Sequence, residues 1–155
     1  MLISIVVLII AFLAVFFFKA YQSKTGNAAG LDDGKLTICS DKPNCVCSEY
    51  PDHSSRYIQP IKLPIEIETE EQFAAYARDL VTQAGGEVTL QENSYLTATF
   101  TSSFFGFVDD LELRLDLENR VIQIRSASRQ GYSDFNANSK RVERLRDLSS
   151  SLKSP

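Results

Sequence analysis

Residue types that often carry chemistry are scarce in this sequence. Met1 is the only methionine, His53 is the only histidine, and tryptophan does not occur. One histidine excludes a metal site built from several histidines and weakens the case for a histidine-activated nucleophile. No acidic residue precedes Asp32, so the later part of the chain carries the excess of negative charge. Because nucleic acid binding needs lysines and arginines that neutralise phosphates, we exclude nucleic acid as a partner. No motif indicates a cofactor.

Charge is also absent from the first 18 residues, which read MLISIVVLIIAFLAVFFF and hold Ser4 as their only polar side chain. As a helix this run spans about 27 Å, close to the ~30 Å of a hydrocarbon core. Lys19 can extend to the interface, where Tyr21 is also favourable. We therefore predict a transmembrane anchor over residues 1–20 that contacts the lipid bilayer through residues 1–18. A cleaved signal peptide is the alternative, but the run lacks a basic start and ends in bulky phenylalanines.

The residues after the anchor bear on its orientation. Residues 21–35 are small, polar and rich in glycine, which predicts a flexible tether. Lys19 and Lys24 follow the span, and the positive-inside rule would then place the folded part in the cytoplasm. The cysteines discussed below favour an oxidising compartment instead. We expect a single-pass membrane protein with a periplasmic or lumenal domain, with the cytoplasmic face as the alternative.

Two helices are predicted in the remaining chain. Thr69 and Gln72 match a capping box, and apolar residues then follow at helical spacing up to a Gly-Gly pair. A second amphipathic helix starts near Asn136 or Asn138 and should lie on a sheet. Its apolar stripe consists of Val142, Leu145, Leu148 and Leu152.

Four segments between these helices alternate apolar and polar residues, which predicts half-buried antiparallel strands. The last two are joined by Leu117–Arg120. If Asp116 pairs with Val121, Leu113 faces Ile124. The leucines of one strand and the isoleucines of the other then lie on the same face of the sheet. The order predicts an α+β fold, an antiparallel four- to five-stranded sheet with two helices packed on one face, plus the transmembrane helix.

We assign residues 36–150 to this single domain and residues 151–155 to a tail. Thr37–Pro64 holds all three cysteines and four of the five prolines. It is typical of an irregular, pinned segment, with one short edge strand within Tyr57–Ile61.

Three ordered motifs lie within the domain: Cys39 with Pro43–Val46 (PNCV), Gly106–Glu112 (GFVDDLE), and Arg125–Phe135 (RSASRQGYSDF) followed by Asn138, Arg141, Val142 and Leu145. Together they resemble an uncharacterised family, number 1499 in the series of domains of unknown function. The sequence departs from the family pattern at Cys47, where most members have serine, and at Asn136, where glycine is common. The resemblance implies the domain limits and an envelope setting in bacteria or plastids. It implies no activity.

The predicted register gathers charged residues on the other face of the last hairpin. Glu112 stands opposite Arg125, and Asp110 is diagonal to Arg125 and Arg129, within reach of these side chains. The following loop has N–H groups that could hold an anion, and either arginine could clamp a carboxylate or phosphate. The alternative is a structural network of cross-strand pairs, with a loop aspartate capping the last helix. The candidate ligand-binding residues are Asp110, Glu112, Arg125, Arg129, Tyr132 and Asp134.

A hydrolase-like enzyme that uses Asp110, Glu112, Arg125 and Arg129 is an alternative function, because paired carboxylates can do acid–base work. The nearby arginines argue against it, since they would keep both carboxylates ionised.

The cysteines offer a second candidate chemistry. A zinc site could use Cys39, Cys45, Cys47 and His53 as ligands, but their spacing departs from the usual zinc knuckle. We favour a Cys39–Cys45 disulfide, worth about 2–3 kcal/mol, with Cys47 as the odd thiol. That bridge underlies the expected oxidising compartment. A Cys/His metal or redox module stays open as an alternative.

The loop that holds Phe104, Phe105 and Phe107 is too aromatic for a solvated turn. We favour Phe105 or Phe107 reaching the core, and the alternative is an exposed patch that contacts the membrane or a protein partner. On this basis we expect a membrane-anchored envelope protein that acts as a non-enzymatic binding or interaction module. The sequence does not indicate an oligomeric state.

Overall fold

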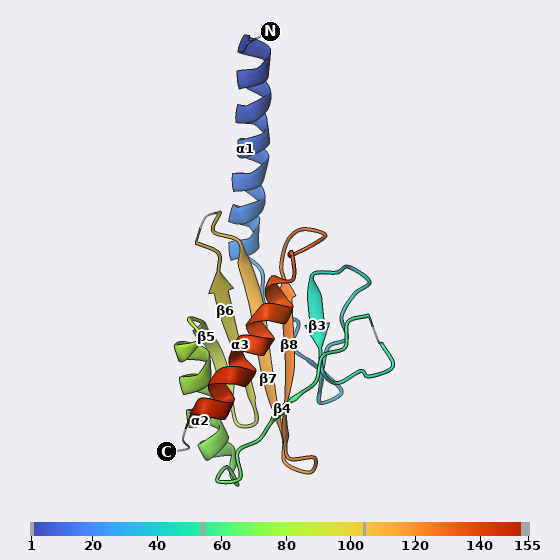
Figure 1. Ribbon diagram of the computed structural model, residues 1–155, viewed down its shortest axis with the longest axis vertical. Coiled ribbons are helices and arrows are strands. Elements are labelled where there is room, and N and C mark those ends of the chain that lie inside the picture. The colour runs from blue at the N-terminus through green and yellow to red at the C-terminus, as the bar shows by residue number, and fades with distance from the viewer. Residues whose placement is uncertain (1, 54, 104, 153–155) are drawn as a thin grey trace.

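The computed structural model describes residues 2–53, 55–103 and 105–152. Within these ranges the chain forms a six-stranded sheet, a small separate hairpin and three helices (Figure 1). In chain order the elements are α1 (Leu2–Lys24), β1 (Leu31–Asp32), β2 (Lys35–Leu36), β3 (Cys45–Cys47), β4 (Ile61–Lys62), α2 (Glu70–Gln83), β5 (Glu87–Glu92), β6 (Tyr95–Thr101), β7 (Val108–Asp116), β8 (Val121–Ser128) and α3 (Ala137–Ser151). The predicted α+β class is confirmed.

The sheet has the order β3-β8-β7-β6-β5, and β4 also pairs with β8. All of these strand pairs are antiparallel. The described residues thus contribute six strands to the sheet, rather than the four to five we expected. The additional strand arises because the pinned segment supplies both β3 and β4. Each has only two or three residues, which is too short for an alternating pattern to reveal it.

The register predicted for the last hairpin is confirmed. Asp116 pairs with Val121, and Leu113 pairs with Ile124. Leucines of β7 and isoleucines of β8 therefore share one face, where all of them are buried. Because side chains alternate along a strand, Glu112 and Arg125, which pair with each other, lie on the other face of the sheet.

Helix α2 begins as its capping box predicts. The Thr69 hydroxyl accepts a hydrogen bond from the Gln72 N–H, and the Gln72 side chain accepts one from the Thr69 N–H. The helix ends just before Gly85, which adopts a left-handed φ of 89° that favours glycine. Its inward side buries Phe73, Tyr76, Ala77, Leu80 and Val81.

Helices α2 and α3 cover the same face of the sheet, as predicted (Figure 1). Helix α2 packs on β5 and β6, and α3 packs on β8. Between the layers lies the main core, in which Phe73, Leu111 and Leu145 are fully buried. Burial of such side chains contributes about 1.5–3 kcal/mol each.

The N-terminus of helix α3 is capped by the side chain of Asp134 and not by that of the N-cap residue. Asn136, at the N-cap, is left-handed (φ 64°) and makes no capping hydrogen bond with its side chain. Asp134 instead accepts hydrogen bonds from the N–H groups of Asn136 (3.0 Å) and Asn138 (2.8 Å). The carboxylate thereby satisfies N–H groups that the first turn leaves without helical partners.

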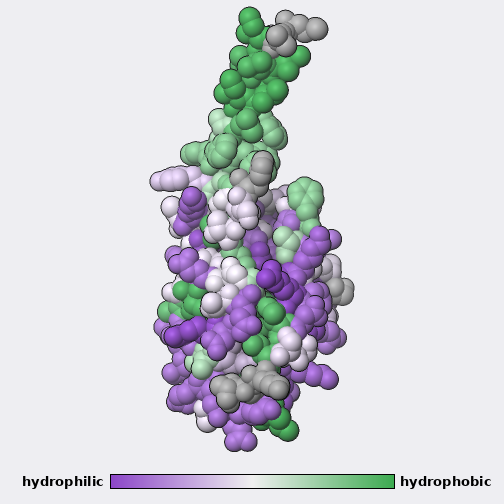
Figure 2. Space-filling view, turned by 60° about the vertical axis from the view of Figure 1, so that its left-hand side comes forward, coloured by the Kyte–Doolittle hydropathy of each residue, from purple (hydrophilic) through white to green (hydrophobic). Residues whose placement is uncertain are grey.

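Helix α1 extends from the domain as a separate apolar rod (Figures 1 and 2). It is long and apolar enough to cross a membrane, and nearly all of its apolar side chains are exposed. The helix continues to Lys24, so it includes the first residues of the expected tether. Ala20 and Ser23 are buried, and the Ser23 hydroxyl accepts a hydrogen bond from the Val108 N–H (3.0 Å). The base of α1 is therefore packed against β7.

Residues 25–36 also differ from a flexible tether. They include the β1–β2 hairpin, and Leu36 is fully buried. The Gly30 N–H donates to Glu112 on β7 (2.8 Å). The segment thus lies on the face of the sheet opposite to α2 and α3, which we call the outer face.

Candidate functional site

The four charged residues predicted to meet on the outer face do so. Glu112 pairs with Arg125 across β7 and β8, and Asp110 pairs with Arg129. Three of the four residues lie on β7 and β8, whose opposite faces are anchored in the main core, and Arg129 directly follows β8, so the alternation along these strands positions the charges. We call these four residues the charge cluster.

Glu112 is the centre of the charge cluster and is fully buried. Its Oε1 accepts a hydrogen bond from Arg125 Nη1 (2.7 Å). Its Oε2 accepts one from the Tyr95 hydroxyl (2.6 Å) and one from the Gly30 N–H (2.8 Å). A buried charge is costly unless it is paired and hydrogen-bonded, and three donors meet this need. The carboxylate therefore holds segment 25–36 onto the sheet.

Tyr95 is a residue of this site that the sequence analysis missed. Burial raises the pKa of Tyr95, and its hydrogen bond to Glu112 raises it further. The phenol consequently stays neutral and donates to the carboxylate. The alternation of side chains along β6 places Tyr95 on the outer face. It does not identify Glu112 as the hydrogen-bond partner of the Tyr95 hydroxyl.

Arg129 is fully engaged in the cluster. Its Nε and Nη2 donate to the two carboxylate oxygens of Asp110 at 2.8 and 2.6 Å, a bidentate pair. Its Nη1 donates to the backbone oxygen of Ser23 at 3.0 Å. Each nitrogen of the guanidinium thus has a protein acceptor, and the pair ties the last turn of α1 to the sheet. This geometry does not favour the predicted anion clamp at Arg129.

A second ion pair on the outer face was also missed. Arg114 on β7 donates to Glu49, whose side chain is almost fully buried, through Nε at 2.5 Å and also through Nη2. Glu49 accepts a further hydrogen bond from the Leu36 N–H at 2.7 Å. The pattern repeats that of Glu112: a carboxylate bonds an arginine of the sheet and a backbone N–H of the covering segment.

The remaining two candidate residues lie elsewhere. Asp134 caps α3, as one of the two interpretations predicted. Tyr132 is 71% exposed in the loop before α3. On the helix side of the sheet, Arg141 donates to Asp109 at 2.7 Å and to Ser126 at 2.8 Å, so these motif residues join α3 to the sheet.

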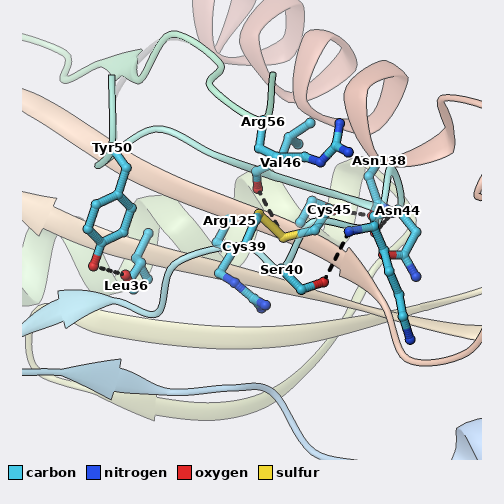
Figure 3. Close-up of a disulfide and its surroundings, with 12 residues drawn as sticks. Leu36, Cys39, Ser40, Asn44, Cys45, Val46, Tyr50, Arg56, Arg125 and Asn138 are labelled. Atoms are coloured by element: carbon cyan, nitrogen blue, oxygen red, sulfur yellow. Dashed lines mark hydrogen bonds between the residues drawn. A yellow bond between two sulfur atoms is a disulfide. The ribbon is translucent and has the colours of Figure 1, made fainter. Parts of the chain in front are cut away.

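The favoured disulfide is present, between Cys39 and Cys45, with a Cα–Cα distance of 5.7 Å (Figure 3). Both cysteines are buried in a second, smaller core that includes Leu36, Tyr95 and Ala127. Cys47 is a buried free thiol, and burial raises the pKa of Cys47. Two of the four residues considered as zinc ligands are therefore bonded to each other. Among the described residues, no group of three or more His, Cys, Asp or Glu could hold a metal ion.

The aromatic loop between β6 and β7 contacts α1. The Phe105 and Phe107 rings lie 5.1 and 6.0 Å from the ring of Phe16. Neither belongs to the buried core clusters, which differs from the interpretation we favoured. Phe104 lies outside the described residues. The loop therefore meets the predicted membrane span.

Two of the grooves that the described residues form lie beside the segments discussed above. The larger, of about 1220 Å³, lies between residues 57–66 and the C-terminal half of α3. The smaller, of about 520 Å³, lies on the outer face, between residues 24–30 and strands β5 and β6. Its lining includes Lys24, Glu87, Thr89, Thr97, Thr99 and Arg129. We call it the outer groove.

The chain matches a known protein family over most of its length. A family model described as "Protein of unknown function (DUF1499)" covers residues 35–148. No curated protein and no solved structure matches the chain.

Proposed function

The chain belongs to the DUF1499 family, and from its geometry we propose that it is a membrane-anchored envelope protein that binds a ligand without catalysing a reaction. In this proposal α1 crosses the bilayer, the domain lies directly at the membrane surface, and the outer groove takes a phosphate-bearing head group. The outer groove is the observation that carries the proposal.

Anchoring through α1 is supported by the contacts at its base. The helix carries no charge up to Phe18, and Ala20 and Ser23 are already packed in the domain. From Phe18 to Ser23 a helix rises about 7.5 Å, which leaves no room for a spacer between bilayer and domain. Phe105 and Phe107, which contact Phe16, would then lie at the hydrocarbon boundary.

The disulfide supports an oxidising compartment for the domain, periplasmic or lumenal, because structural disulfides persist there and are rare in the cytosol. The lysines after the span would favour the cytoplasmic side. We give more weight to the disulfide because it is buried with its surroundings packed on it.

The burial and hydrogen bonding of the Glu112 and Asp110 carboxylates favour binding over catalysis. A general acid or base must exchange a proton with a substrate, and so needs an accessible oxygen. Glu112 is fully buried with three donors, and Asp110 is held bidentately by Arg129. The cluster therefore suits an architectural role, in which it holds residues 23–30 against the sheet, and its Arg129 lines the outer groove.

The outer groove has the chemistry of a head-group site. Lys24 supplies a cation from the last turn of α1, and Thr99 supplies a hydroxyl beside the Thr89 and Thr97 hydroxyls, which bond each other at 2.8 Å. One lysine near a membrane surface contributes about 1 kcal/mol toward an anionic lipid. Because Lys24 lies one turn past the span, the groove would open at the level of lipid phosphates. The larger groove has no such relation to α1.

The test is methyl NMR of threonine-labelled full-length protein in nanodiscs. Raising the fraction of phosphatidylglycerol in phosphatidylcholine should shift the Thr97 and Thr99 methyl signals in a saturable way. Lys24→Ala should weaken the response about fivefold, the equivalent of ~1 kcal/mol. The matched control is Lys140→Ala, which removes the same charge from the exposed face of α3 and should change nothing.

The same measurement can contradict the proposal. If the threonine signals do not respond to the anionic lipid, or respond equally to phosphatidylcholine alone, the head-group site is wrong. If glycerol phosphate in solution produces the same shifts, the groove binds a soluble phosphate ligand instead of a lipid.

A further inference from the structure

The loop between β8 and α3, residues 129–136, exposes two aromatic side chains. Tyr132 is 71% exposed and Phe135 is 89% exposed. Phe135 is more exposed than any other large apolar side chain that the structure describes, including those of α1. Apolar surface concentrated in one place marks a contact site more often than a single exposed side chain does, and here two large aromatic residues are exposed on one short loop.

The conformation of this loop is held by hydrogen bonds to Asn44, outside the loop, and to Asp134 within it. The Asn44 side chain donates to the Gly131 oxygen at 2.9 Å, and Asp134 accepts from the backbone at the start of α3. Phe135 itself adopts a left-handed φ of 53°, which is uncommon for a residue of this size. Such strain persists only where the surrounding contacts determine it, and it is found at functional sites. The aromatic side chains are thus presented by a constrained loop.

The loop lies beside the base of α1. Arg129, its first residue, donates to the Ser23 oxygen in the last turn of the helix. In Figure 1 the loop rises to the level of that turn, and the loop between β6 and β7 rises on the other side of the helix. Two aromatic loops therefore flank the point where the predicted span enters the domain.

The start of this loop lies at the depth of Ser23, which corresponds to the interfacial layer of a bilayer if α1 crosses it. Ser23 lies about 7.5 Å along the helix from Phe18, the last residue of the uncharged run. The head-group layer of a bilayer is about 5–8 Å thick on each side. Aromatic side chains with a polar edge, such as tyrosine, are favoured at this depth. The partner that fits the loop is therefore a lipid surface.

We propose that residues 129–136 form a second membrane contact, which inserts Tyr132 and Phe135 into the head-group layer. The inference rests on the proposed function in one respect, namely that α1 crosses the bilayer. A single helix restrains neither rotation nor tilt of the domain. Contacts on both sides of the helix restrain both, and they hold the outer groove at a constant height above the lipid.

The absence of tryptophan from the chain makes a direct test available. Three single variants of the full-length protein each carry one reporter: Phe135→Trp in the loop, Phe17→Trp in the span and Ile65→Trp as the matched control. Ile65 is 81% exposed, and the segment between β4 and α2 to which it belongs lies at the end of the domain far from α1 (Figure 1). The proteins are placed in nanodiscs of phosphatidylcholine and phosphatidylglycerol with brominated acyl chains.

The expected result is that brominated lipid quenches the emission of Phe135→Trp and Phe17→Trp but not that of Ile65→Trp. Acrylamide, a quencher in the water phase, should give the reverse order, and the emission of Phe135→Trp should shift to the blue relative to Ile65→Trp. All three positions are exposed, so the replacements do not disturb a packed core.

Two outcomes would overturn the inference, and they are distinguishable. If Phe135→Trp behaves like Ile65→Trp while Phe17→Trp is quenched by lipid, the helix is an anchor and the loop makes no membrane contact. If Phe17→Trp also escapes quenching by lipid, the anchoring proposal fails, and the loop inference fails with it.

Discussion

The two faces of the sheet are covered in different ways. The face under α2 and α3 is covered by regular helices, and its core consists of apolar side chains such as Leu113 and Ile124. The outer face is covered mainly by residues 25–44, which have little regular structure. It is held by buried ion pairs, backbone hydrogen bonds to carboxylates and one disulfide.

This difference shows that one sheet can be closed by two kinds of interaction. Apolar burial depends on area, so many residue combinations can satisfy it. Buried ion pairs depend on geometry, and removing one partner leaves an uncompensated charge. We therefore expect the outer face to be the more sensitive to single substitutions and to pH, and the helix-covered face to respond mainly to loss of volume.

The largest effect is expected from Glu112→Ala. It leaves the Arg125 guanidinium buried without its carboxylate and removes the acceptor of Tyr95 and Gly30. We expect the free energy of unfolding to fall by about 3–5 kcal/mol, measured by urea denaturation of the full chain in detergent. Glu143→Gln, which breaks the exposed pair with Arg146, is the control and should cost less than about 1 kcal/mol. Equal losses for the two variants would contradict the importance assigned to burial.

A loss of about 3 kcal/mol is expected from Leu113→Ala on the helix-covered face. Leu113 is fully buried, and its truncation removes apolar contacts and leaves a cavity. The loss should be independent of pH between 6 and 8, roughly the range in which few side chains titrate. Leu117→Ala, in the exposed turn of the same hairpin, is the comparison and should change the stability little. A pH-dependent loss at Leu113 would mean that the two faces are not independent.

Replacing both Cys39 and Cys45 by serine should destabilise the protein by about 2 kcal/mol, because the bridge closes a short loop.

The same pair of cysteines also predicts the number of reactive thiols. Of the three cysteines, one should react with a thiol reagent in denaturant without reductant, and all three should react after reduction. In the native protein the buried Cys47, whose pKa is raised by burial, should react slowly. Three reactive thiols without reductant would contradict the disulfide and the oxidising compartment inferred from it.

The smallest effect, about 1.5 kcal/mol near neutral pH, is expected from Tyr95→Phe, which removes one hydrogen bond to a carboxylate. The same variant should alter the alkaline limit of stability. Burial raises the pKa of Tyr95 in the folded state above the ordinary value of 10.0. Its contribution is therefore complete below pH 10 and is lost as the pH rises toward the folded pKa, because only the unfolded state ionises there.

The loss of stability above pH 10 should accordingly be shallower in Tyr95→Phe than in the unmodified protein. Tyr132→Phe is the matched control, since Tyr132 is 71% exposed, and it should leave the slope unchanged. If both variants change the alkaline slope equally, Tyr95 is not the buried phenol that the structure places beside Glu112.

Several features of the fold could be predicted because they depend on neighbours in the sequence. The Thr69–Gln72 capping box indicates the start of α2, and alternation on β7 and β8 determines the pairing of Leu113 with Ile124. The same register brings Glu112 opposite Arg125. The Cys39–Cys45 bridge was favoured from the residue types and their spacing. In each case the pattern lies within one element or one hairpin.

Other features could not be predicted because their partners are far apart in the chain. The Gly30 N–H bonds Glu112, the Leu36 N–H bonds Glu49, and the Ser23 oxygen bonds Arg129. A backbone group is the same at every residue, so no side-chain pattern identifies which one a buried carboxylate will bind. The expected tether was for this reason not recognised as part of the domain.

The sequence by itself determined the apolar span, the helices, the pairing of the last two strands and the face on which charges gather, since periodicity and turn chemistry act over a few residues. Only the tertiary structure decided that the charge cluster holds the covering segment and the base of α1. It also decided that two aromatic loops flank that helix. These relations depend on how distant segments are brought together, and burial and hydrogen bonding act on the closed fold as a whole.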